Sequence, residues 1–320
     1  MRWLAALVLA LVPALADAQT WKPQKTVEIV SSAGAGGSAD RGARTVQRYL
    51  QALPGMPSVI VTNRTGGGGS VAFTFISQHA GDAHFLGTMA TNIVTNHIVG
   101  VSPLSYRDFT PLNILMREYV VVSVLADSPL ASAKDLLARL RKDPGAITFG
   151  FAAAPGNQNH VVIGMIARAA GVDPKALKTV VFNSGSAAAT AMLGGHVNVL
   201  VGTPGTVAPH LAAGKARAIG ISAPQRQREP YASTATLREN GIDAVYYSWR
   251  GFLAPRGITP AQVAFWEQAF AKVVDADEWK QDLQKNVWIE DFRSAAETRK
   301  HLDAEYELLK TILVELGVVR

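Results

Sequence analysis

The sequence predicts an α/β fold of two domains, each built on a mostly parallel sheet flanked by helices, with a cleft between them. Short β-type runs are repeatedly followed by a Gly-rich or polar turn and then by a helical pattern, an order that favours parallel strands. A second series of this kind starts near residue 121. The chain has 320 residues, of which 48% are hydrophobic, and this is enough for two ordinary cores.

Each series contributes its own strands. The first has predicted strands at residues 26–31, 59–62 and 85–89, and the second at 119–125, 147–151, 179–182, 197–201 and 216–222. An extended segment at 246–255 crosses back to the first series, and two late helical regions follow it, starting at Thr259-Pro260 and at a capping box from Ser294 to Glu297. We therefore expect domain 1 at 19–120 plus 250–320 and domain 2 at 121–249.

The first residues have the features of a secretory signal peptide. Arg2 supplies a positive charge, residues 3–15 form an apolar run, and Ala16-Asp17-Ala18 is a small-x-small cleavage site. Because a membrane-spanning helix needs about 20 apolar residues, this run favours cleavage over anchoring. We expect a periplasmic protein that loses residues 1–18 and keeps no membrane anchor.

Composition argues against several classes of function. With no cysteine, the chain has no disulfide, no thiolate nucleophile and no lipid-carrying cysteine. The net charge of +6 comes from dispersed basic residues without interleaved aromatic ones, which favours anionic small molecules over nucleic acid. The seven histidines are scattered, and no phosphate-binding or zinc-peptidase motif is present. We expect no metal, no cofactor and no catalytic residue, and a monomer.

Glycine-rich or polar junctions join strands to helices in both domains. Such a junction lets backbone N–H groups converge at the positive end of a helix, where an anion binds, although a single one can be only a tight turn. Comparable junctions recur at residues 34–40, 66–70, 152–159 and 183–187, and those of two facing domains would line one cleft. They carry hydroxyl and amide side chains rather than paired carboxylates or an activated nucleophile, which indicates binding rather than catalysis.

The candidate ligand-binding residues lie in these junctions and at other strand ends. They are Ser32, Gly36, Gly37, Ser38, Asp40, Thr91, Asn92, Ala153, Gly156, Asn157, Gln158, His160, Ser184, Gly185, Ser186 and Thr203. His160 opens a helix after a junction, where a capping or packing role is the alternative to facing the cleft. In the first loop we expect Gly37 to permit close approach of backbone to ligand, with the neighbouring Arg41 as a control if it faces solvent.

Two other classes of function compete with this interpretation. Gly34-x-Gly36-x-x-Ala39 and a Tyr306-x-x-x-Lys310 pair are compatible with an NADP-dependent short-chain oxidoreductase. That pair falls on the last predicted helix, too late to be followed by the strands such an enzyme needs, and an exported protein would not meet a recycling NADPH pool. A sensor or scaffold protein is the third class, and a purely structural role predicts no ligand in the cleft.

Motifs along most of the predicted mature chain match a known family in order and spacing. They are Gly36 to Asp40 with Ala43-Arg44, Asn63-Arg64 with Gly66, Gly68 and Gly69, Arg107-Asp108-Phe109 with Pro111, Gly156 to His160, Leu193 to Val199, Pro209-His210-Leu211 with Gly214-Lys215-x-Arg217-Ala218, and Trp249-x-Gly251 to Pro255. The chain thus resembles the periplasmic receptors of tripartite tricarboxylate transporters, the Bug proteins.

This resemblance implies a type II periplasmic-binding-protein fold. It also implies a small carboxylate ligand, held largely by backbone amides and bridging waters, and transient contact with membrane permease subunits. By position, the family's ligand loops correspond to residues 32–40, 153–160 and 184–187. Where the family has a proline-rich first loop and Tyr-Lys-Gly, this chain has Ala33-Gly34-Ala35 and Asn183-Ser184-Gly185. These departures leave the choice between a di- or tricarboxylate, an aromatic acid and an uncharged ligand open.

Overall fold

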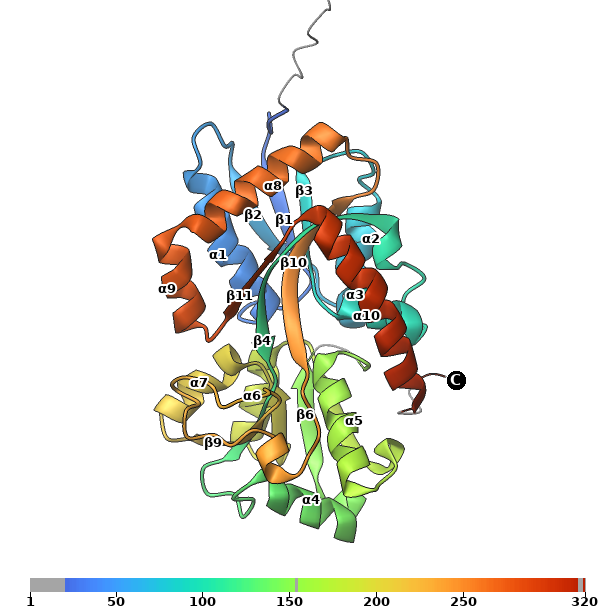
Figure 1. Ribbon diagram of the computed structural model, residues 1–320, viewed down its shortest axis with the longest axis vertical. Helices are drawn as coiled ribbons and strands as arrows, with labels where there is room; N and C mark the ends of the chain where they lie inside the picture. Colours follow the sequence, from blue (N-terminus) through green and yellow to red (C-terminus); the bar gives the residue numbers. More distant parts are fainter. Residues whose placement is uncertain (1–20, 153–154, 316–318, 320) are drawn as a thin grey trace, which may run out of the picture.

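The computed structural model describes residues 21–152, 155–315 and 319, and within them two lobes, each with its own sheet (Figure 1). The predicted signal peptide lies outside the described residues, and so does Ala153. One sheet has six strands in the order β11-β4-β10-β3-β1-β2, and the other has five in the order β7-β6-β8-β5-β9. We call the first sheet with its helices lobe 1 and the second with its helices lobe 2.

Lobe 1 comes from both ends of the described chain. Its strands are β1 (Val27–Ser31), β2 (Val59–Asn63), β3 (Phe85–Met89), β4 (Phe109–Tyr119), β10 (Tyr247–Pro255) and β11 (Ile289–Arg293). Its helices are α1 (Ser38–Ala52), α2 (Ser70–Ser77), α3 (Asn92–Ile98), α8 (Pro260–Asp275), α9 (Asp277–Lys285) and α10 (Ala295–Glu315). The last helix begins at the predicted capping box, in which Ser294 and Glu297 bond reciprocally.

Lobe 2 is formed by the middle of the chain. Its strands are β5 (Val121–Leu125), β6 (Thr148–Ala152), β7 (Lys178–Phe182), β8 (Val199–Gly202) and β9 (Ala216–Ile221). Its helices are α4 (Ala133–Lys142), α5 (Gln158–Ala170), α6 (Gly185–Leu193) and α7 (Pro204–Ala212). The division into domains at 120/121 and 249/250 stays a prediction, and β10 begins at Tyr247, just before the second of these boundaries.

Both sheets are mixed, which corrects the expectation of mostly parallel sheets within an otherwise confirmed α/β fold. Parallel pairing is confined to β1 with β2 and β3, and to β6 with β7 and β8. The other pairs are antiparallel, because the chain enters and leaves lobe 2 through two long neighbouring strands, β4 and β10, that run in opposite directions. Neither β4, with Pro111 and Asn113, nor β11, with two acidic residues, has a typical strand composition.

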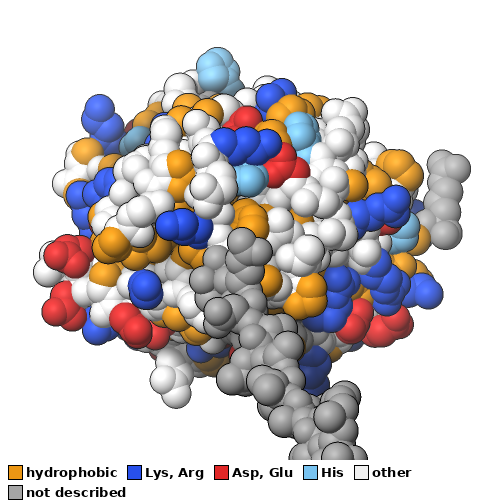
Figure 2. Space-filling view, turned by 90° about the horizontal axis from the view of Figure 1, so that it is seen from above, with side chains coloured by type: hydrophobic (Ala, Val, Ile, Leu, Met, Phe, Trp, Pro, Cys, Tyr) orange, Lys and Arg blue, Asp and Glu red, His pale blue; other side chains and the backbone are white. Residues whose placement is uncertain are grey.

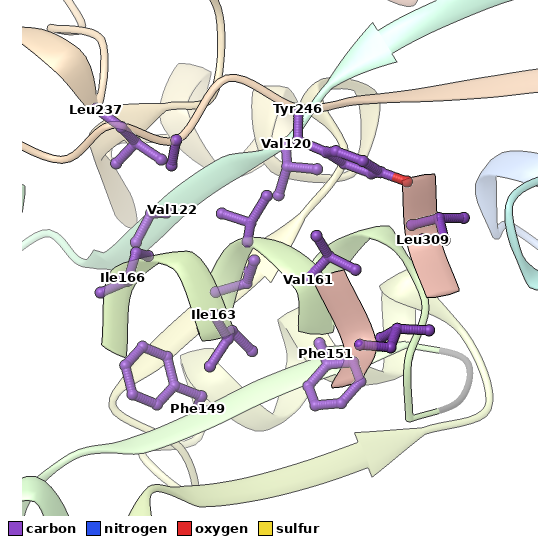
Figure 3. Packing of buried hydrophobic residues seen from close by; sticks show 14 of the residues in the cluster. Val120, Val122, Phe149, Phe151, Val161, Ile163, Ile166, Leu237, Tyr246 and Leu309 are labelled. Atoms are coloured by element: carbon purple, nitrogen blue, oxygen red, sulfur yellow. The ribbon is translucent and has the colours of Figure 1, made fainter. Parts of the chain in front are cut away.

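Apolar packing continues from one lobe to the other. Figure 3 shows Phe149, Phe151 and Val161 of lobe 2 packed in one cluster with Val120, which joins β4 to β5, and Leu309 of α10. A second cluster lies within lobe 1 and a third mainly within lobe 2. Because α10 and the crossing strands take part in the shared cluster, the lobes are joined by packed side chains as well as by two chain segments.

The outer face of lobe 1 has a mixed charge. On the face seen in Figure 2, Lys and Arg side chains form several groups separated by acidic, apolar and uncharged ones. Such a face does not create one strong field of a single sign. Within the described residues, no helix combines the length and apolar character that a membrane span requires.

Candidate ligand-binding site

A cavity of about 70 Å³ lies between the two lobes, a size suited to a compact small molecule. Lobe 1 lines it with Ser32, Ala33, Gly37, Ser38, Ala39, Ala90, Asn92 and Arg250. Lobe 2 lines it with Ala152, Asn157, Gln158, Asn159, Asn183, Ser184, Gly185, Leu200, Val201, Gly202, Thr203 and Thr206. Backbone segments and small neutral side chains dominate both lists, as the sequence predicted.

Several helices begin at this cavity. In α1, α5, α6 and α7 the lining includes residues of the cap or the first turn, so the positive ends of four helix dipoles surround one space. Asn157 caps α5 by accepting from the N–H groups of Asn159 and His160, and Ser184 caps α6 by accepting from Ala187. An anion placed here meets favourable electrostatics from both lobes.

Asp40 holds the first loop in shape from outside the cavity. Its carboxylate accepts from the Gly36 N–H at 3.0 Å, Asn63 Nδ2 at 2.8 Å and Arg44 Nε at 3.0 Å. Burial raises the pKa of Asp40, but these hydrogen bonds outweigh that effect and lower the pKa below its ordinary value. Asn63 also donates to the Ala33 carbonyl, so β2 braces the loop that follows β1.

Gly36 links the two lobes through its carbonyl. This oxygen accepts from Arg41 Nη1 at 2.6 Å within lobe 1 and from Ser186 Oγ at 3.0 Å in lobe 2. Gly36 has a φ of +75°, whereas Gly37 has a φ of −71°. A side chain at Gly37 would therefore be crowded rather than strained in its backbone, because its Cβ would lie 3.0 Å from the Gly34 carbonyl oxygen.

Arg41 is half-buried at the boundary between the lobes, so it cannot serve as the solvent-facing control that the sequence suggested. Its Nε and Nη2 atoms are buried without a hydrogen-bond partner among the described residues, and Nη2 lies near Gly205 of lobe 2. Burial lowers the pKa of Arg41, and the negative charge of Glu118 opposes that shift. Arg41 thus stabilises the Gly36 turn at the boundary between the lobes.

A buried ion pair lies behind the lobe 1 wall of the cavity. Arg250 on β10, which is 8% exposed, pairs with Glu118 on β4 through Nη2 and Oε1 at 3.0 Å, and Glu118 is 0% exposed. Ser38 Oγ donates to the same Oε1 at 2.5 Å, which connects the pair to the first turn of α1. Sequence reasoning missed both charges, although each interrupts a strand-forming segment in which a charge is unexpected.

The structure brings most of the predicted site residues to the cavity. Those that line it are Ser32, Gly37, Ser38, Asn92, Asn157, Gln158, Ser184, Gly185 and Thr203. Those that lie outside its lining are Gly36, Asp40, Thr91, Gly156, His160 and Ser186. Of the other lining residues, Ala33, Ala39, Ala152, Asn159 and Asn183 lie within the predicted loops and junctions but were not among the individual candidates. Sequence reasoning did not select Ala90, Leu200, Val201, Gly202, Thr206 and Arg250. Most of these are apolar or directly adjacent to predicted residues, and Arg250 alone among them carries a charge.

His160 supports a turn rather than the cavity wall. Its Nδ1 accepts the Gly156 N–H at 2.9 Å, and its ring stacks on Phe151 with centroids 5.2 Å apart and an interplanar angle of 16°. Burial lowers the pKa of His160, which favours the neutral ring whose Nδ1 can accept that bond. The capping and packing alternative therefore describes this residue.

Of the two features compatible with an oxidoreductase, the segment from Gly34 to Ala39 borders the cavity through Ala39, but the Tyr306 and Lys310 pair does not. Tyr306 packs beside Tyr106 and His97, and neither it nor Lys310 lines the cavity. Among residues 21–152, 155–315 and 319, no cluster of three or more His, Asp or Glu side chains is arranged to hold a metal ion. The cavity is small, helix N-termini surround it, and its lining residues are uncharged apart from Arg250.

The fold and this cavity define a two-lobed solute-binding protein. The family model for the tripartite tricarboxylate transporter family receptor matches residues 43–318, and the chain belongs to that family. A UPF0065 protein of Cupriavidus necator is 30% identical over 287 residues, covering 88% of this chain and 84% of the relative. BugT of Bordetella pertussis is 27% identical over 249 residues, covering 74% and 73%.

Solved structures of receptors share the fold. Rpa4515 of R. palustris with adipate has a TM-score of 0.85 at 23% identity, covering 92% of this chain and 98% of that one. MatC from Rhodopseudomonas palustris with bound malate has a TM-score of 0.82 at 22% identity, covering 91% and 100%. The sequence-based identification of the family and of the two-lobed α/β fold is thereby confirmed, and the chain is a solute-binding protein of this type.

Proposed function

We propose that this protein captures a small carboxylate in the periplasm and presents it to the permease subunits of a tripartite tricarboxylate-type transporter, without chemical change to the ligand. The observation that carries the proposal is the convergence of the N-termini of α1, α5, α6 and α7 on one small cavity between the lobes. Fixed positive dipole ends around one cavity favour a carboxylate. The adipate and malate bound by two structural neighbours agree with this ligand class.

The lining residues also support the absence of catalysis. A reaction would need a nucleophile, a general base or a metal within reach of the ligand, and the described lining residues are mostly backbone, alanine, serine, threonine and amides. Arg250 is the charged residue among them, and it is already paired with Glu118. Such a lining can bind and orient a ligand but offers no group that would react with it.

Two features of the proposal concern location and movement. Export with removal of residues 1–18 follows from the Ala16-Asp17-Ala18 pattern, and intact-mass measurement of the native protein tests it. Closure of residues 121–249 against the rest of the mature chain follows from a site shared by two lobes joined by β4 and β10. Small-angle scattering should show a smaller radius of gyration with saturating ligand.

A thermal-shift screen of the mature protein against carboxylates, followed by calorimetry, tests the central claim. A carboxylate present at 100 times its dissociation constant should stabilise the folded protein by about 2.7 kcal/mol. Dinucleotides form the contrasting arm of the screen. Stabilisation by NADP and by no carboxylate would overturn the proposal in favour of a nucleotide-dependent enzyme.

A further inference from the structure

Two asparagines that line the cavity, one from each lobe, each have a buried side-chain oxygen that accepts no hydrogen bond from the described residues. Asn92 opens α3 in lobe 1 and Asn159 lies in the first turn of α5 in lobe 2, and both line the cavity. They are 8% and 3% exposed, respectively. The Oδ1 atom of each is buried and has no hydrogen-bond partner among the described residues.

The orientation of both amides is fixed by their nitrogen atoms. Asn92 Nδ2 donates to the Gly68 carbonyl at 2.6 Å, and Asn159 Nδ2 donates to the Ala152 carbonyl at 2.8 Å. Because a carbonyl oxygen can only accept, turning either amide over would place two acceptors against each other. The free group in each case is therefore Oδ1, an acceptor that requires a donor.

This arrangement is not shared by every asparagine at the cavity. Asn157, on the same turn as Asn159, has its Oδ1 occupied by the N–H groups of Asn159 and His160. The Oδ1 atom of Asn157 is thus occupied by capping its own helix. The Oδ1 atoms of Asn92 and Asn159 accept no hydrogen bond from the described residues. A buried acceptor without a partner destabilises the protein, so a ligand that supplies a donor gains affinity relative to one that does not.

We propose that the ligand of this cavity carries a hydrogen-bond donor, a hydroxyl or an ammonium group, in addition to its carboxylate, and that Asn92 and Asn159 accept from it. The inference rests on the proposed carboxylate-binding function and narrows its ligand class. The helix N-termini hold the carboxylate, and the two amide oxygens distinguish a substituted acid from its unsubstituted analogue. A site built with such acceptors discriminates strongly against ligands that lack the donor.

Calorimetry with matched four-carbon and five-carbon acids tests the proposal on the mature protein. Succinate, malate and aspartate differ only in a hydrogen, hydroxyl or ammonium at one carbon, and glutarate, 2-hydroxyglutarate and glutamate repeat the series. Malate or aspartate, or the corresponding five-carbon acid, should bind at least tenfold more tightly than the unsubstituted acid. Comparing the hydroxy acids with the amino acids shows whether the site prefers a hydroxyl or an ammonium donor.

Variants assign the discrimination to the two amides. Asn159→Leu and Asn92→Leu should reduce the preference for the substituted acid to less than threefold. Asn113→Leu is the matched control, since Asn113 is also buried with an unpartnered amide but does not line the cavity, and it should leave the preference unchanged. If a variant fails to fold, the preference of the parent protein still decides.

The outcomes separate the inference from the function on which it rests. Equal affinity for substituted and unsubstituted acids would overturn the inference and leave carboxylate capture intact. A preference that survives in both Asn92→Leu and Asn159→Leu would likewise overturn the assignment to these residues. Binding of no acid in either series or in the wider carboxylate screen would overturn the proposed function and the inference together.

Discussion

The two walls of the cavity are built by different physical means. The lobe 1 wall is braced by charge, with Asp40 holding the first loop and the buried Glu118 and Arg250 pair tying α1 to the crossing strands. The lobe 2 wall is formed by neutral caps, of which Asn157 and Ser184 use their side chains to bind their own helices. Both walls present helix N-termini to the cavity, but charged side chains brace the lobe 1 wall, whereas neutral side chains cap the helices of the lobe 2 wall.

The largest effect should come from breaking the charged brace of lobe 1. Glu118→Leu leaves Arg250 buried without its partner, and we expect a loss of about 3–5 kcal/mol in the free energy of unfolding, measured with urea. The double variant Glu118→Leu/Arg250→Leu should recover part of this loss because it removes the isolated charge. Strictly additive losses would show that the pair does not brace the wall.

A pH-dependent effect should arise at the base of the crossing strand β10. Glu305 of α10 receives the Trp249 Nε1 hydrogen bond at 2.6 Å and lies near Tyr246 and His301, with the His301 ring nitrogen at 3.6 Å. Burial raises the pKa of Glu305 to about 7, although the bonds from Trp249 and Tyr246 and the charge of Arg293 oppose it. Its folded pKa is thus above the unfolded value, so its stabilising contribution is lost as pH rises from about 4.5 through 7.

Glu305→Gln removes this loss, because the amide cannot ionise. Between pH 5 and pH 8 the free energy of unfolding of the variant should improve relative to the parent by about 2 kcal/mol. Burial is the main cause that lowers the pKa of His301 to about 4. His301 therefore decreases the free energy of unfolding as the pH falls from 6.5 through 4, whereas Glu305 decreases it as the pH rises. Because the His301 ring nitrogen lies 3.6 Å from Glu305, the difference between the two unfolding curves below about pH 6.5 reports both groups, and above that pH it reports Glu305. A constant difference across this range would contradict the prediction.

Adding a side chain at Gly37 of the first loop should weaken ligand binding. Gly37→Val places a branched side chain at a site where even Cβ lies 3.0 Å from the Gly34 oxygen and 3.8 Å from Ser184 Cβ of lobe 2. We expect at least a tenfold loss in affinity by calorimetry, about 1.4 kcal/mol. Gly145→Val in lobe 2 is the control, since an added Cβ there meets only ordinary contacts. Normal binding by Gly37→Val would mean that the ligand is held elsewhere.

The smallest effect should come from the contact between the two walls. Ser186→Ala removes the hydrogen bond from Ser186 Oγ to the Gly36 carbonyl, an exposed bond with a net contribution of about 0.5–1 kcal/mol. The dissociation constant should therefore rise about two- to fivefold while the free energy of unfolding changes little. Ser77→Ala, which removes an exposed serine bond within α2, should leave affinity unchanged. Equal effects of the two substitutions would show that the contact between lobes does not support closure.

Elements with strong local signals were predictable from the sequence. The helix starts predicted at Thr259 and Ser294 begin α8 and α10 where expected, because a cap bonds within three residues of itself. The junctions at residues 34–40, 152–159 and 183–187 also line the cavity, since strand ends and helix starts meet at one edge of a parallel pairing, whereas the junction at 66–70 does not line it. These features depend on neighbours in the chain, which the sequence displays directly.

Only the tertiary structure decided the features that depend on distant partners. β4 is a strand because β10 pairs along its whole length, although Pro111 and Asn113 disfavour that conformation locally. Arg250 and Glu118 became a buried pair through the same strand pairing. Arg41, adjacent to the first loop, is half-buried, and Gly205 of lobe 2 lies near its Nη2 atom. Long-range pairing and desolvation set these properties, and neither is determined by the local sequence.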